Sequence, residues 1–134
     1  MREKLLAFLE QFEGRPTVWG KDDCSASAAM WLRENGIDVR LPAYSSREEA
    51  HALIKQAGGL VHLWDDALSV TDVRERYDRP ELGDIAIIDT RTFGQVGVIC
   101  GSGGICWWRK NEGGFWLAPR YFVKVWAISC WAIS

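Results

Sequence analysis

The chain has 134 residues, which suits one domain built around one hydrophobic core and makes a second domain unnecessary. Its formal net charge is -2, so it lacks the basic excess that follows a phosphate backbone, and nucleic acid is not expected as a partner. No run of the sequence reaches the roughly 20 apolar residues of a membrane helix, so no membrane span is expected.

Two helices are predicted at the start of the chain. In MREKLLAFLEQFEG, Leu5, Leu9 and Phe12 share one helical face among charged residues. This is the pattern of an amphipathic helix rather than of a signal peptide, and it predicts a protein made in the cytoplasm. The second helix, CSASAAMWLREN, follows Asp22 and Asp23, either of which is a suitable cap.

Two further helices are expected in the middle of the chain. The stretch SSREEAHALIKQAGG has serines followed three residues later by glutamates, which is a capping-box pattern, and then apolar residues at helical spacing. The segment from Leu60 to Leu68 predicts a shorter helix, with Leu63, Trp64 and Ala67 also turned inward.

From Pro80 onward the sequence changes to short apolar runs separated by turns. The predicted strands are GDIAIID, QVGVICG, ICWWR, FWLA and YFVKVWAI, and the turn GSGG joins the second to the third as a hairpin. Helices followed by an antiparallel sheet indicate an α+β domain over residues 1–134. Residues 129–134 repeat the letters WAIS and form a short apolar extension, which either docks on a neighbouring protein or folds back on its own sheet.

The predicted hairpin carries a candidate binding surface. Strand alternation sends Trp107 and Trp108 to opposite faces, so only one of the two is expected in the core. The exposed indole, with Arg109, has the composition of an interface anchor; the alternative is an aromatic side chain that covers the end of a small core. In the extension, Trp131 is a further expected contact with a neighbouring protein.

Cys100 and Cys106 flank the GSGGI connection and leave three alternatives open: a disulfide, two metal ligands, or two facing strand residues. No Cys-x-x-Cys motif and no nearby histidine completes a zinc site. We therefore expect no metal and no cofactor. Free thiols are expected because no export signal is visible.

Cys24 is the candidate nucleophile. It directly follows Asp23 and so is expected in the first turn of a helix, where unpaired N–H groups and the helix dipole stabilise a thiolate. Neighbouring carboxylates oppose this effect by repelling the anion. A nucleophilic thiol also needs a base, and the chain has only His51 and His62, each in a predicted helix. The alternative is that Cys24 packs as a small apolar residue.

Three stretches carry a resemblance to a known family: RPTVWGKDDCSASAAMWLRENGIDV, AGGL and LGDIAIIDTRTFGQVGVICGSGGI. From about Arg15 to Ile128 the chain resembles an uncharacterised family of small phage and prophage tail proteins related to the NlpC-type, papain-like cell-wall cysteine peptidases. The resemblance implies a papain-like NlpC-type fold, with N-terminal helices packed on a C-terminal antiparallel sheet. In those peptidases a cysteine opens a helix after a Trp-Gly and Asp-Cys pattern, and the catalytic histidine directly precedes a Val-Gly-Ile-like triplet.

By this resemblance Cys24 occupies the position of the nucleophile, and Gln95, which directly precedes Val96, occupies the position of the histidine. A glutamine amide has no proton-accepting pKa near neutrality, so it cannot act as a general base. Loss of that base removes an activation of roughly 100- to 10,000-fold. We therefore expect an incomplete catalytic site.

The resemblance implies a structural or docking component of a phage or prophage tail, at the tail tip or baseplate, assembled in the bacterial cytoplasm and carried in the virion. Other tail proteins are the expected partners, with peptidoglycan as a second one. Two alternatives stay open. One is an active peptidoglycan peptidase or amidase with Cys24 as nucleophile, and the other is a non-catalytic peptide- or glycan-binding module.

Overall fold

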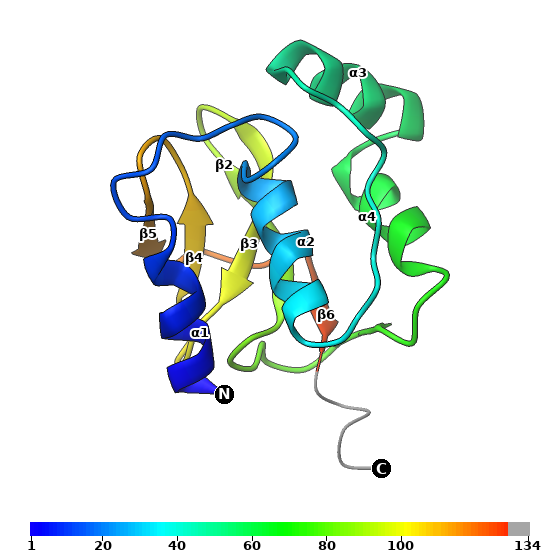
Figure 1. Ribbon diagram of the computed structural model, residues 1–134. Coiled ribbons are helices and arrows are strands. Elements are labelled where there is room, and N and C mark those ends of the chain that lie inside the picture. Colours follow the sequence, from blue (N-terminus) through cyan, green and yellow to red (C-terminus); the bar gives the residue numbers. More distant parts are fainter. Residues whose placement is uncertain (129–134) are drawn as a thin grey trace.

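The computed structural model describes residues 1–128, in which four helices precede a six-stranded antiparallel sheet (Figure 1). The helices are α1 (Arg2–Glu10), α2 (Cys24–Glu34), α3 (Arg47–Ala57) and α4 (Leu60–Leu68). The strands are β1 (Arg74–Glu75), β2 (Ile85–Thr90), β3 (Gly94–Cys100), β4 (Cys106–Arg109), β5 (Gly114–Leu117) and β6 (Lys124–Ala127). Their order in the sheet is β1-β6-β2-β3-β4-β5, and the expected α+β class is confirmed. Within the described residues, no helix combines the length and the hydropathy of a membrane-spanning segment.

Helix α2 lies across the middle of the sheet, directly against β3 (Figure 1). Two features of the sequence allow this close approach. The inward residues Ala28 and Ala29 are small and buried, and Gly97 of β3 has no side chain to hold the helix away. A Cβ atom added at Gly97 would lie 3.6 Å from the Ser25 hydroxyl oxygen and 3.8 Å from the Cys24 carbonyl oxygen. The start of α2 is therefore seated on the central strand.

Both faces of the sheet are covered. Alternate strand residues on the face under α2 join α1, α2 and α4 in the larger core, which includes Ile85, Ile87, Ile99, Trp107 and Trp126. The residues between them pack on the other face in a smaller cluster of Ala86, Ile88, Val96, Val98, Cys100, Cys106, Trp108 and Val125. The strands are therefore apolar at consecutive positions rather than at every second one.

This arrangement corrects one expectation. Trp107 and Trp108 do point to opposite faces, but both are buried, with 5% and 8% of their surface exposed. Trp108 packs between the rings of Phe93 and Phe115, at centroid distances of 5.6 and 5.3 Å. Strand alternation alone does not show that a second core covers the other face, so neither Trp107 nor Trp108 is the expected exposed indole.

Of the four described helices, α3 has the fewest buried residues. Ser46 accepts a hydrogen bond from the Glu49 N–H, which confirms it as the cap. The Glu49 carboxylate accepts from the N–H of Ser45 rather than of Ser46, so the predicted capping box is shifted by one residue on that side. Only Ala50 of its 11 residues is buried, and the helix packs mainly against α4. Gly58, in the left-handed conformation with φ of 93°, ends the helix and allows the chain to turn into α4.

Cys100 and Cys106 are direct partners in the β3–β4 register. Both are buried, and both thiols are free. Of the three alternatives, the structure therefore shows two facing strand residues. In the described part of the chain, no group of three or more His, Cys, Asp or Glu residues is placed to hold a metal ion. The extension 129–134, with Cys130 and Trp131, lies outside the described residues.

Candidate functional site

A cavity of about 300 Å³ opens beside the first turn of α2. One wall is formed by the loop before α2 and by the start of the helix, and the sheet contributes residues of β3 and β4. The opposite wall is formed by α3 and α4, with the apolar side chains Leu53, Ile54, Leu60 and Leu63. The cavity brings together residues that are separated by up to 94 positions in the sequence, from Thr17 to Asn111.

The start of α2 is fixed by Asp23, the residue that caps it. The Asp23 carboxylate accepts hydrogen bonds from the Gly20 N–H at 2.7 Å, the Ala26 N–H at 3.1 Å and the Tyr44 hydroxyl at 2.8 Å. With three donors, its charge is well satisfied within the protein. Burial and the Asp23 carboxylate raise the pKa of Tyr44, so its hydroxyl stays protonated and remains a donor.

Gly20 explains the Trp-Gly part of the sequence pattern. Its φ is +86°, and a Cβ atom at this position would lie 1.9 Å from the backbone oxygen of Tyr44. No side chain fits in that space, so only glycine allows the loop and the segment of Tyr44 to approach each other. This approach places the Tyr44 hydroxyl within reach of the Asp23 cap.

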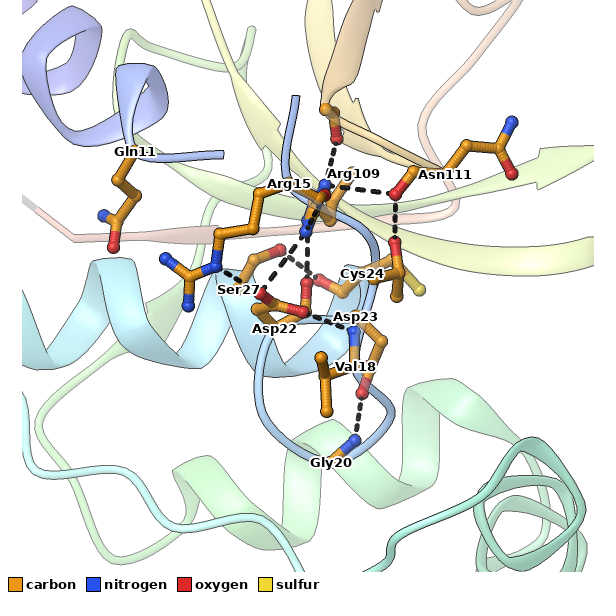
Figure 2. Close-up of polar contacts among 12 residues, drawn as sticks. Gln11, Arg15, Val18, Gly20, Asp22, Asp23, Cys24, Ser27, Arg109 and Asn111 are labelled. Atoms are coloured by element: carbon orange, nitrogen blue, oxygen red, sulfur yellow. Dashed lines mark hydrogen bonds and ion pairs between the residues drawn. The ribbon is translucent and has the colours of Figure 1, made fainter. Parts of the chain in front are cut away.

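Asp22 is fully buried and anchors the same loop from the other side (Figure 2). One carboxylate oxygen accepts from the Val18 N–H at 2.7 Å. The other lies 3.3 Å from a guanidinium nitrogen of Arg109 and 3.2 Å from one of Arg15. These two contacts hold that oxygen as ion pairs and not as aligned hydrogen bonds.

Arg109 is the centre of this network and not a surface anchor. Only 2% of it is exposed, which corrects the expectation that it contacts a neighbouring protein. It donates to the backbone oxygens of Asp22 at 3.0 Å, Arg15 at 2.9 Å and Gly113 at 2.7 Å (Figure 2). Arg109 thereby ties the end of β4 to the loop that precedes α2.

Cys24 is the first residue of α2, is partly exposed, and lines the cavity. Burial of the thiol, followed by the negative charge of Asp23, raises the pKa of Cys24 to about 11. Hydrogen bonds from Gly97 and Ser25 act in the opposite direction but are weaker. The helix N-terminus is therefore insufficient to create a thiolate here, and Cys24 is a neutral thiol at physiological pH.

The two side chains considered as proton acceptors differ in their placement. His51, an exposed residue of α3, lines the same cavity as Cys24 and Gln95. His62 is exposed on α4 beside Gly58 and is not among the residues that line the cavity. The hydrogen bonds that affect the Cys24 thiol come from Gly97 and Ser25 and not, within residues 1–128, from an imidazole.

The structure adds lining residues that the sequence reasoning did not single out: Trp19, Tyr44, Arg47, Phe93 and Lys110. Trp19 belongs to the quoted Trp-Gly pattern, so the sequence already indicated that it lies close to the start of the capped helix. Lys110 directly follows Arg109, but one side chain is buried and the other is half-buried. No spacing rule distinguishes the two, because their difference depends on Asp22, 87 residues from Arg109.

A family profile described as a domain of unknown function, DUF6950, matches residues 1–128. No curated protein and no solved structure matches the chain.

Proposed function

The chain belongs to the DUF6950 family, a domain of unknown function, and we propose that it is a non-catalytic docking protein whose cavity captures a peptide segment of its partner. One observation carries this proposal. Cys24 and Gln95 line the same cavity, but burial and Asp23 raise the pKa of the thiol to about 11, and the amide cannot accept a proton. A cavity with a catalytic layout and without an ionised nucleophile is suited to binding rather than to cleavage.

The proposal also covers the fold of the protein. We propose that it is an NlpC-like, papain-like fold with a degenerate site. Three placements support this: Cys24 begins α2, Gln95 lies on β3, and Gly97, two residues further on, lies against the start of α2. The setting at the tip or baseplate of a phage tail, in the virion after assembly in the bacterial cytoplasm, rests on the resemblance described above.

The dimensions of the cavity support a peptide ligand. A volume of about 300 Å³ is at the lower end for a ligand pocket and is sufficient for one or two side chains. Aliphatic residues of α3 and α4 line one part, while Tyr44, Gln95 and Asn111 offer polar groups in another. An extended peptide presents apolar side chains and backbone amides to such a surface. Trp107 and Trp108 are buried and give no support for docking through that surface, whereas Trp116 of β5 is 40% exposed.

The reactivity of Cys24 tests the proposal. Alkylation by iodoacetamide, followed on the tryptic peptide that contains Cys24, should be slow at pH 7 and increase towards pH 11. Gln95→His should increase the rate at pH 7 by about tenfold or more, because an imidazolium beside the sulfur stabilises the thiolate. Gln95→Asn is the matched control and should leave the rate unchanged. Rapid alkylation of the unmodified protein at pH 7 would contradict the proposal.

A second function, an active peptidoglycan peptidase or amidase, is favoured by one observation: His51 lines the same cavity as Cys24. In this alternative His51 takes the thiol proton after the ligand has bound. Purified peptidoglycan should then be cleaved, and the products should disappear in Cys24→Ala and in His51→Gln but persist in His62→Gln. That result would replace the docking proposal, whereas intact peptidoglycan in every sample supports it.

A further inference from the structure

Besides Cys24 and Tyr44, five charged or titratable side chains line the cavity: Asp23, Arg47, His51, Arg109 and Lys110. Two of them have partners within the protein, although Asp23 keeps its negative charge because its donors are uncharged. Asp23 accepts from three donors, and Arg109 is paired with Asp22. Arg47 and Lys110 are different, since no ion pair among residues 1–128 involves either of them. With Arg109 paired to Asp22, the two cations Arg47 and Lys110 outweigh the single Asp23 carboxylate, so the net charge of the cavity lining is positive.

The ammonium group of Lys110 is held in position by aromatic rings. Its Nζ atom lies 4.1 Å from the ring centroid of Phe93 and 4.9 Å from that of Trp108, and both rings line the cavity. A cation–π contact restricts the side chain but leaves its charge available to an anion. Because Lys110 is already ordered, less conformational entropy is lost when an anion binds.

Arg47 contributes the second positive charge from the opposite wall. It is the first residue of α3, and its side chain is exposed. The helix that it begins also supplies Leu53 and Ile54 to the cavity. One wall of the cavity is therefore apolar and ends in the cation of Arg47, and the other carries the ordered ammonium group of Lys110. Such a cavity is complementary to a ligand that combines an apolar group with an anion.

We infer that the cavity recognises a peptide that presents a carboxylate beside an apolar side chain. The carboxylate pairs with Lys110 and Arg47, while the side chain fills the space lined by Leu53, Ile54, Leu60 and Leu63. This inference rests on the proposed peptide-binding function and names its ligand class. A peptide C-terminus and an Asp or Glu side chain supply the same chemistry.

Three synthetic peptides test the inference and separate these sources: acetyl-Gly-Ala-Leu with a free C-terminus, the same peptide as its C-terminal amide, and acetyl-Glu-Ala-Leu amide. Binding is measured by NMR titration of the ¹⁵N-labelled full chain. At least one carboxylate-bearing peptide should bind about tenfold more tightly than the neutral amide, and added salt should reduce the difference. The peptide that gains affinity identifies the source of the carboxylate.

Charge variants locate the effect. Lys110→Gln and Arg47→Gln should each remove most of the preference for the carboxylate, whereas Lys55→Gln, an exposed residue of α3 outside the cavity, should leave it unchanged. Lys110→Arg keeps the positive charge and should retain the preference, which guards against a folding defect. Equal affinity for the acidic and neutral peptides would overturn the inference while leaving the proposed function in place. Absence of binding by all three would overturn both.

Discussion

The two helices that border the cavity differ in how the protein holds them. Helix α2 lies on the central strand, and a buried network of Asp22, Asp23 and Arg109 fixes its first turn. Helix α3 has a single buried residue, Ala50, and packs mainly against α4. The wall at Cys24 is therefore rigidly positioned, whereas the wall at His51 is held by few buried contacts.

The difference indicates a division of roles within the cavity. The rigid wall carries Cys24 and Gln95, the two residues that the resemblance aligns with the nucleophile and the histidine. The less constrained wall carries Arg47 and His51, which that pattern does not include. If the proposed function holds, the fold preserves the framework of the site, and ligand selection depends on the wall that can adapt at low cost in free energy.

The largest expected loss of stability comes from disrupting the network that fixes the start of α2. Arg109→Ala leaves the buried Asp22 carboxylate without its buried partner and should lower the free energy of unfolding by about 3 to 5 kcal/mol, measured by urea denaturation. Arg15→Ala is the matched control, because Arg15 contacts the same carboxylate but its side chain is 49% exposed. It should cost about 1 kcal/mol or less. Equal losses in the two variants would contradict the assigned role of Arg109.

A smaller effect is expected from the loop before α2. Gly20→Ala places a Cβ atom 1.9 Å from the Tyr44 oxygen, so the loop must move, at a cost of about 1 to 3 kcal/mol. Gly36→Ala, just beyond the other end of α2, has a similar φ of +81° but no heavy atom within 4 Å of the added Cβ. The difference between the unfolding free energies of these two variants measures the steric clash without the conformational strain that they share.

Removing the helix caps compares the two walls directly. Asp23→Ala and Ser46→Ala each delete a capping oxygen, worth about 1 kcal/mol, and Asp23→Ala also removes the acceptor of the Gly20 N–H and the Tyr44 hydroxyl. For Asp23 the loss should appear in the global free energy of unfolding. For Ser46 it should appear as faster amide exchange confined to α3, measured by hydrogen-exchange mass spectrometry. A uniform increase in exchange in both variants would show that the two helices unfold together.

A further expected effect is a dependence of stability on alkaline pH. Folding raises the pKa of Cys24 from 9.0 to about 11, so between these pH values the unfolded chain has lost a proton that the folded chain retains. The unfolded state binds fewer protons, and the free energy of unfolding therefore falls as pH rises from 9 towards 11. Cys24→Ala should make this decline shallower. An unchanged slope in urea titrations would show that the thiol is not shielded.

The local features of the fold were predictable from the sequence. The range Leu60–Leu68 for α4, the cap of α3 at Ser46 and the choice of Asp22 or Asp23 as the cap of α2 each depend on a few neighbouring residues. The structure confirms the first two and selects Asp23 for the third. The short strand β1 was missed because its two residues, Arg74 and Glu75, have no apolar pattern and are defined only by pairing with β6.

The candidate site was predictable only in part. The positions of Cys24 and Gln95 follow from the resemblance, and the structure places both at one cavity. The burial of Arg109 was not predictable, since it depends on a carboxylate far away in the sequence. The presence of His51 in the cavity depends on how α3 is oriented by the Gly58–Gly59 turn, a tertiary property that helical periodicity does not encode.

The facing pair Cys100 and Cys106 allows the opening of the sheet to be measured through the reactivity of its own thiols. Both sulfur atoms are buried between β3 and β4, and burial raises the pKa of Cys106 to about 12, so a disulfide reagent reacts only when the hairpin separates. In a variant with Cys24 and Cys130 replaced by alanine, the colour released by such a reagent over time then reports how often the central strands open. The rate is readable without a dye, an isotope or an engineered cysteine.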